Sequence, residues 1–315
     1  MKITVQDFTG IYDYQPFMQE LRAAAETSKD IHWLDCTKIV GTDCYCDDEA
    51  INKINEIIDN AESNNASENR SKSKCGNVSA IHFFDNGNYH YMSKLWTDKI
   101  QEPFTLIVFD HHPDMQPPRF GGILSCGGWV LEVLEKNKFI QNAIIIGVAD
   151  RLVEEIQQEF AAPSDTSSNQ NNLLQKVTFI RESEVTSLSS LDKSQMLASE
   201  MPMQALSLHS PYTFVADRLS SFVFRLSSPH SLYVSIDKDA LAPTYAATNW
   251  DQGSLSVESL KKIITELAAN HKILGIDICG ERSQDFEGNE YHTIQDADSI
   301  NNALNCELLH FLQNL

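Results

Sequence analysis

The segment "FTLIVFDHHPDMQ", Phe104 to Gln116, indicates the class of structure that this 315-residue chain adopts. Its first six residues are almost entirely apolar, which is typical of a strand buried on both faces of a parallel sheet. Two aspartates and two histidines follow within the next five residues, "DHHPD", Asp110 to Asp114. Burying charged groups is costly unless something compensates for them. Because binding sites in open parallel sheets gather at the carboxyl ends of strands, the segment predicts a polar site at that edge.

Apolar runs alternate with amphipathic segments along the rest of the chain. The other predicted strands are Lys2–Val5, Ile31–Leu34, Ser79–Phe84, Ala143–Val148, Lys176–Ile180, Ser231–Ile236 and Lys272–Ile278. Helical spacing of apolar residues predicts helices over Tyr14–Glu26, Asp47–Ala61, Trp129–Asn137, Arg151–Phe160, Ser256–Asn270 and Asp298–Leu312. This alternation predicts an α/β protein with a mostly parallel sheet of about eight strands, covered by helices on both faces.

Two segments rich in serine and asparagine interrupt the pattern, at about residues 62–77 and 163–172. They are almost free of large apolar side chains, so we expect mobile surface insertions and not linkers between domains. The stretch from Ser187 to Ser228 is rich in serine and leucine, and we expect helix and loop there.

The composition excludes some classes of function. Asp plus Glu number 44 against 24 Lys plus Arg, a formal net charge of −20, so we do not expect nucleic-acid binding, which needs a basic surface. No apolar run reaches the roughly 18 residues of a spanning helix, and the N-terminal residues do not resemble a signal peptide, so no membrane partner is expected. Seven cysteines, an odd number, favour a reducing cytoplasm over a disulfide framework. The C-x-C pair of Cys44 and Cys46 lacks a second pair to complete a zinc site, and we expect ordinary structural thiols there.

Polar side chains cluster at the ends of several predicted strands. Taking the chain as extended, alternating residues share one side, which groups the carboxylates and imidazoles. Several buried carboxylates close together would repel one another unless a cation joined them, and separate helix caps are the less favoured interpretation. Mixed oxygen and nitrogen ligands without thiolate suit Mn²⁺ and tolerate Fe²⁺, Co²⁺ or Zn²⁺. Six side chains are enough for two ions, and they are His90, Asp110, His112, Asp114, Asp237 and Asp239.

These residues resemble those of the ureohydrolases, the family of arginase, agmatinase and formimidoylglutamase. That family carries G-G-x-H, D-x-H-x-D and S-x-D-x-D segments at successive strand ends; here they read "GNYH" (Gly87 to His90), "DHHPD" and "SIDKD" (Ser235 to Asp239), in the same order. The resemblance covers about His82 to the C-terminus, and Asn88 departs from it by replacing a glycine. It implies an arginase-like three-layer α/β/α sandwich, one catalytic domain over residues 1–315, two Mn²⁺ ions per chain, and a homo-oligomer of three or six chains.

The resemblance also implies a role for each ligand. The first ion would be bound by His90, Asp110, Asp114 and Asp237, and the second by His112, Asp110, Asp237 and Asp239. Asp110 and Asp237 would bridge the two ions, and His111 is left to packing around the site. A hydroxide bridging the ions would attack the carbon of a guanidino, amidino or formimino group, with Asp239 handling protons.

Three departures from the family make this an atypical member. Cys126, in "SCGGW", stands where relatives have a proton-relay histidine, so the thiol either takes that role or is a small buried residue. The substrate-binding glutamate of the family's D-x-x-E is displaced by one residue in "DICGE", so either Glu281 or Asp277 would hold a cationic substrate. The alternative is an ordinary salt bridge to Arg282 or another arginine. The loop after D-x-H-x-D is mostly apolar, with Gln116 and Arg119 as its polar candidates for substrate binding, which makes arginine itself a doubtful substrate.

The sequence thus supports three hypotheses of function. The first is a cytoplasmic metal-dependent hydrolase of linear amidines, with Asp239, Cys126 and Glu281 as catalytic residues and a small cationic substrate. The second is a metal-binding or regulatory homologue in which the change from histidine to cysteine impairs turnover. The third is a two-metal phosphoesterase, for which Arg119 is the supporting feature.

Overall fold

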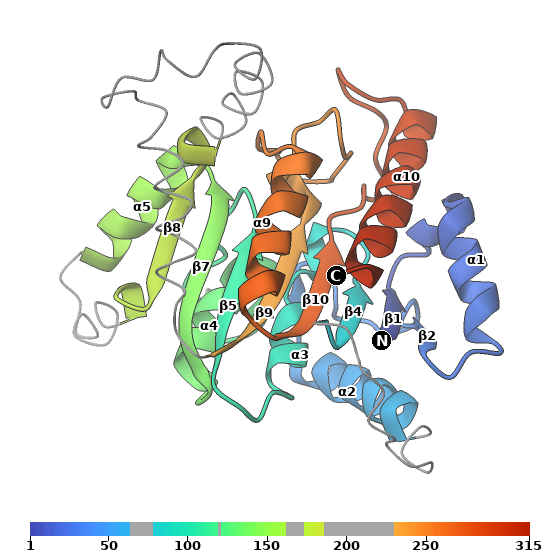
Figure 1. Ribbon diagram of the computed structural model, residues 1–315, viewed down its shortest axis with the longest axis horizontal. Helices are drawn as coiled ribbons and strands as arrows, with labels where there is room; N and C mark the ends of the chain where they lie inside the picture. The colour runs from blue at the N-terminus through green and yellow to red at the C-terminus, as the bar shows by residue number, and fades with distance from the viewer. Residues whose placement is uncertain (64–77, 119–120, 162–172, 186–229) are drawn as a thin grey trace, which may run out of the picture.

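The computed structural model describes residues 1–63, 78–118, 121–161, 173–185 and 230–315. Within these ranges, the strands of the main sheet are β1 (Lys2–Asp7), β2 (Ile31–Asp35), β4 (Ala80–Phe83), β5 (Phe104–Phe109), β7 (Ile140–Val148), β8 (Val177–Arg181), β9 (Ser231–Asp237) and β10 (Ile273–Cys279). They follow the order β2-β1-β4-β10-β9-β5-β7-β8, and every neighbouring pair is parallel (Figure 1). This confirms the predicted α/β class and all eight predicted strands.

Helices cover both faces of the sheet and form three layers with it. Those with described bounds are α1 (Pro16–Ala25), α2 (Asp48–Ser63), α3 (Met92–Thr97), α4 (Trp129–Lys136), α5 (Asp150–Ala161), α9 (Val257–Asn270) and α10 (Ile294–Gln313). Apolar residues of α1, α9 and α10 pack on one face, and those of α2 to α5 pack on the other. In Figure 1, α9 and α10 lie in front of the central strands, with α3 and α4 behind them.

The helices begin where local signals allow. Ser256 caps α9 by accepting a hydrogen bond from the backbone N–H of Ser259 at 3.1 Å. Helix α10 begins at Ile294, four residues before the predicted start, because Thr293 and Asp296 form a capping box. The sequence analysis missed α3, whose six residues are too few to show an amphipathic period.

Two antiparallel strands, β3 (Tyr45–Cys46) and β6 (Leu124–Ser125), form a small second sheet that was not predicted. The expected insertion at 163–172, the stretch from Ser187 to Ser228, and residues 64–77 of the other insertion lie outside the described residues, while residues 62 and 63 end α2. Among the helices that the structure describes, none combines the length and apolar character needed to cross a bilayer.

Candidate metal centre

The register of the central strands brings the predicted site together. Ile236 of β9 lies opposite Phe109 of β5, so the residues that follow, Asp237 and Asp110, leave the sheet side by side. On its other side, β9 pairs with β10 so that Asp237 lies opposite Cys279. The polar residues therefore converge at the carboxyl edge of the sheet, as the sequence predicts.

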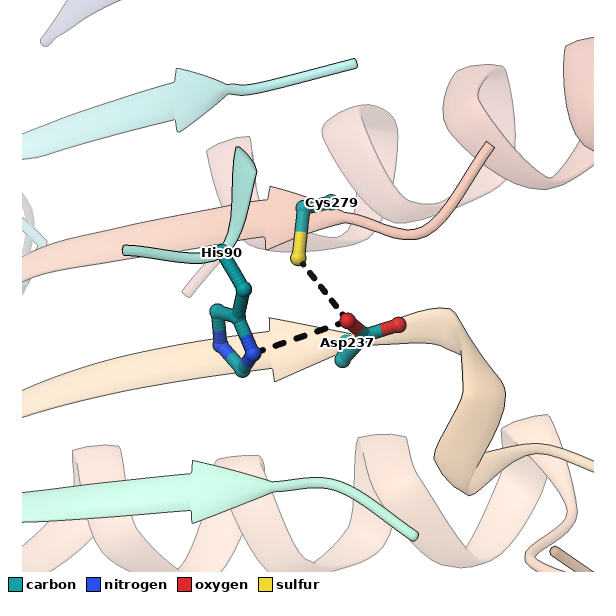
Figure 2. Close-up of side chains that lie close together, drawn as sticks. All are labelled: His90, Asp237 and Cys279. Carbon is teal, nitrogen blue, oxygen red and sulfur yellow. Dashed lines mark hydrogen bonds and ion pairs between the residues drawn. The ribbon is translucent and has the colours of Figure 1, made fainter. Parts of the chain in front are cut away.

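His90 forms the centre of a first group of side chains. It follows the 3-10 helix Gly87–Tyr89 and is buried. Its Nδ1 atom lies 3.0 Å from Asp114 Oδ2, 3.2 Å from Asp110 Oδ2 and 3.5 Å from Asp237 Oδ2. Figure 2 shows the imidazole turned toward Asp237. Its other nitrogen, Nε2, lies 2.8 Å from Ser235 Oγ, and donation to that hydroxyl leaves the Nδ1 lone pair facing the carboxylates, as a metal-binding histidine requires.

His112 forms the centre of a second group. Its Nδ1 atom lies 2.9 Å from Asp239 Oδ2 and 3.4 Å from Asp110 Oδ1. Its Nε2 atom lies 2.9 Å from Asp251 Oδ1. Asp110 therefore turns one carboxylate oxygen toward each group, which is the arrangement expected of a carboxylate that bridges two ions.

The backbone at the site is not extended, so the alternation argument that grouped these residues is wrong in its detail. The strand β5 ends at Phe109, and Asp114 has a φ of 49°, in the left-handed region that residues other than glycine seldom adopt. Asp239 lies in the 3-10 helix Lys238–Ala240, with its N–H bonded to Asp237 Oδ1 at 3.0 Å. Side-chain hydrogen bonds to these turns, and not a strand's period of two, aim the carboxylates inward.

The site carries more negative charge than its own cations balance. Burial, with the nearby Asp239, raises the pKa of Asp237 to about 7, and burial, with the nearby Asp110, raises that of Asp239 to about 6. Burial lowers the pKa of His90, but its hydrogen bonds to Asp110 and Asp114 outweigh this and raise it well above its usual value. Among the described residues, no lysine or arginine lines the cavity here. Four carboxylates and two imidazoles packed this closely fit one or two divalent cations, which would balance the negative charge.

A cavity of about 350 Å³ opens onto these groups. All six predicted ligands line it, as do the predicted Gln116 and Cys126. The sequence analysis gave no role to Glu155 and Glu159 of α5, yet both line the same cavity. Their spacing of four residues puts them on one helix face and was the available signal. They add negative charge to the wall of this cavity.

Cys126 lies in the cavity wall, where the resemblance places a proton relay. Contact with Cys44 and burial raise the pKa of its thiol. A neutral thiol donates a hydrogen bond but accepts protons poorly, so a relay role for Cys126 stays a prediction. Gln116 is held beside it by a 2.9 Å bond from its backbone N–H to the oxygen of Gly127. Arg119 lies outside the described residues.

The structure does not bring Glu281 or Asp277 to the cavity. Glu281 is buried in an ion pair with Lys238 and accepts hydrogen bonds at 2.8 Å from Gln15 Nε2 and Asn305 Nδ2. The turn before it is made by Gly280, which has a φ of 95°, and a Cβ there would lie 2.7 Å from the backbone nitrogen of Lys238, so only glycine fits. Glu281 therefore forms a salt bridge, but its partner is Lys238 and not Arg282, which pairs with Asp298.

Asp277 lies in the interior of β10, below the cavity and not in its lining. Its Oδ1 atom lies 2.7 Å from His82 Nδ1 and accepts a 2.7 Å hydrogen bond from the hydroxyl of Tyr233. Cys279 is the next residue on the same face of this extended strand. Its thiol lies 3.3 Å from Asp237 Oδ2 (Figure 2). Cys279 thus contacts the site, whereas Asp277 is held in a buried polar network.

Comparisons with known proteins give a fold and leave the family open. No protein-family model matches this chain. An uncharacterized protein of Thermotoga maritima is 24% identical over 314 residues, which cover 98% of this chain and 92% of that protein.

Solved structures resemble the chain along almost all of its length. Arginase from Bacillus caldovelox is 14% identical, with 98% of this chain and 97% of that one covered and a TM-score of 0.54. Proclavaminate amidino hydrolase from Streptomyces clavuligerus is 12% identical, with 99% and 92% covered and a TM-score of 0.54. A Trypanosoma cruzi formiminoglutamase variant with Mn²⁺ is 11% identical, with 99% and 92% covered and a TM-score of 0.52. The chain therefore has the arginase-like α/β/α fold on which these ureohydrolases are built.

Proposed function

We propose that this protein is a metal-dependent hydrolase that cleaves a linear carbon–nitrogen bond in a guanidino, amidino or formimino compound. The observation that carries the proposal is the pair of groups around His90 and His112, which share Asp110 through its two oxygens. Their place at the carboxyl edge of an arginase-like sheet supports it. Fold alone permits many functions, so the donor set carries the argument.

His90 and Asp114 would hold one ion and His112 and Asp239 the other, with Asp110 and Asp237 shared between the two. We propose Mn²⁺ for both, in keeping with the donor chemistry and with the manganese in the formiminoglutamase structure. When bound, two such ions would lower the pKa of a water molecule and polarise the substrate's carbon–nitrogen group.

The chain's own side chains would select and orient a cationic substrate. Glu155 and Glu159 line the same cavity as the ligand groups, and the whole chain is acidic. A guanidinium or amine is attracted by such a surface, and a carboxylate pairs with it through charge-assisted hydrogen bonds. Asp239, at the reacting edge, would accept a proton from the attacking water and pass it toward the leaving nitrogen.

The direct test combines metal analysis with an activity screen. Purified protein loaded with Mn²⁺ would be assayed for urea and ammonia release from a set of guanidino, amidino and formimino compounds. We expect two equivalents of metal and turnover of at least one cationic compound. An Asp239→Asn variant that binds metal yet turns over at the wild-type rate would contradict the proton role given to that residue.

A second candidate function is a metal-binding or regulatory protein without turnover. Two observations favour it: Cys126 stands at the relay position with a raised pKa, and Glu281 is fully engaged by Lys238. Metal stoichiometry of two with no release of urea or ammonia from any compound would support this second candidate over the first.

A further inference from the structure

Cys44 and Cys126 lie directly opposite each other across the small sheet of β3 and β6. The antiparallel register pairs Tyr45 with Ser125 and Cys46 with Leu124, so the next pair outward is Cys44 with Cys126. The N–H of Cys126 donates to the oxygen of Cys44 at 2.9 Å. A direct backbone hydrogen bond brings two residues to within reach of each other, and a disulfide needs Cα atoms roughly 4.4–6.8 Å apart.

The two thiols also interact with each other. Their contact lowers the pKa of the Cys44 thiol and, with burial, raises that of Cys126. The more acidic thiol of such a pair is the one that reacts as a thiolate, and its neighbour then attacks the mixed disulfide that forms. Cys44 is also the more strained of the two: its φ is 58°, inside a three-residue turn closed by the Tyr45 N–H on the oxygen of Asp43 at 2.6 Å.

The position of this pair sets it apart from the other described cysteines. Cys44 and Cys126 both line the cavity of the candidate metal centre and are half-buried. Cys36, Cys46 and Cys279 are buried, and Cys306 is exposed on α10.

We propose that Cys44 and Cys126 form a dithiol site that reacts with low-molecular-weight disulfides and closes to an intramolecular disulfide in the cavity wall. In the first step the Cys44 thiolate attacks one sulfur of the oxidant, a bond from Cys44 to that sulfur forms, and the oxidant's own sulfur–sulfur bond breaks. In the second step Cys126 gives its proton to solvent and attacks Cys44 Sγ, which releases the second half of the oxidant. Two electrons and two protons pass from the protein to the oxidant, which leaves as two thiols.

This inference does not rest on the proposed function, because it concerns a covalent change that is measured directly. A disulfide would remove the S–H group of Cys126 from the cavity wall. It would also tie together segments that lie before and after the ligands His90 and Asp110.

The test uses the full chain in a background with Cys75→Ser and Cys306→Ser, which removes the exposed thiol of α10 and a cysteine outside the described residues. The protein is treated with oxidised glutathione, and its intact mass and non-reduced peptides are determined. We expect a mass lower by two hydrogen atoms, no retained glutathione, and one linked peptide pair that joins Cys44 to Cys126. Adding Cys126→Ser should instead trap one glutathione on Cys44, and Cys44→Ser should abolish the reaction.

Other results would overturn the proposal. If Cys44 keeps its glutathione while Cys126 is intact, the two thiols do not form a disulfide. The same conclusion follows if both stay reduced while a small-molecule dithiol in the same solution is oxidised. A linked peptide that joins Cys44 to Cys46 places the reaction elsewhere. Circular dichroism of each variant verifies the fold. If the spectra are unchanged and any of these outcomes is found, the proposed disulfide between Cys44 and Cys126 is refuted.

Discussion

Two buried polar clusters lie on opposite sides of the short segment "SIDKD". Asp237 and Asp239 turn toward the cavity, where four carboxylates face two imidazoles and no lysine or arginine of the described lining. Lys238, between them, turns the other way and pairs with Glu281. One cluster has an excess of negative charge that it does not balance, and the other is neutral within itself.

The second of these, the rear cluster of Lys238, Glu281, Gln15 and Asn305, shows how the protein buries charge when no ligand is involved. Lys238 and Glu281 are almost fully buried, and Glu281 also accepts hydrogen bonds from Gln15 and Asn305, with Asn305 donating to Gln15 Oε1 at 2.8 Å as well. Buried ion pairs are tolerated when the remaining donors and acceptors are satisfied in this way. The front cluster, formed by the four carboxylates and two imidazoles of the cavity, also has hydrogen-bond donors, such as Trp129 Nε1 on Asp114, but no lysine or arginine in the described lining. This missing counter-charge is an argument for an external cation.

Removing the carboxylate of Asp110, which the two groups share, should have the largest effect of all, a loss of bound metal. We expect Asp110→Ala to lose both equivalents of metal, because each ion would be bound through one oxygen of Asp110. Metal content after gel filtration measures this. The control is Asp35→Ala, an exposed carboxylate at the end of β2, which should keep two equivalents. Two equivalents retained in Asp110→Ala would falsify the site.

The rear cluster should respond in stability. Lys238→Met leaves Glu281 buried without its cation, so we expect a loss of about 3–5 kcal/mol in the free energy of unfolding. Lys272→Met breaks an exposed pair with Glu102, 3.0 Å apart, and should cost only about 0–1 kcal/mol. Urea denaturation of both variants gives the difference. Equal costs for the two variants would mean that burial does not distinguish the pairs.

Asp251 tests the asymmetry inside the front cluster. Its carboxylate orients the His112 imidazole by a hydrogen bond to Nε2. At His90 the corresponding nitrogen contacts the hydroxyl of Ser235 and not a carboxylate. We expect Asp251→Asn to weaken one of two Mn²⁺ sites about 10–100-fold and leave the other unchanged. Calorimetric titration resolves the two sites, and Asp285→Asn, an exposed change elsewhere, should alter neither. If both sites weaken together, the two groups do not bind separate ions.

The smallest effect concerns a carboxylate outside both clusters. Burial raises the pKa of Asp7 to about 6, above the value of about 4 in an unfolded chain, so the folded state retains the proton longer. Asp7 therefore lowers stability as pH rises from about 4 to 6. Asp7→Asn keeps the oxygen that accepts the Gly10 N–H at 2.7 Å but removes the charge. Its free energy of unfolding should increase relative to wild type across that pH range, and a constant difference would show that Asp7 does not titrate there.

The sequence predicted what depends on local pattern. Every strand of the main sheet was found because continuous apolar runs such as Phe104–Phe109 are needed to cross a sheet covered on both faces. The six clustered polar residues followed from residue type and place at strand ends. Their grouping was predicted although the actual backbone is turned at Asp114 and Asp239.

Features that depend on distant partners could not be predicted. The direction of Glu281 is set by the turn at Gly280 and by Lys238, 43 residues earlier in the chain. Cys44 reaches the cavity because β3 pairs with β6, some 80 residues later, and two-residue strands leave no period to detect. The roles of Glu155 and Glu159 required knowing which face of α5 meets the cavity.

The rear cluster has a consequence for how the chain matures on the ribosome. All six candidate ligands have been synthesised by Asp239, but Lys238 gains its counter-charge only with Glu281, and that carboxylate is fully bonded only after Asn305 of α10 has emerged. Gln15, which precedes the first helix, likewise gains its hydrogen bond to Glu281 only after that residue has been synthesised. The contacts that hold Lys238 and Glu281 behind the metal-binding edge therefore come from opposite halves of the chain, and the set is complete only after the last helix has been synthesised.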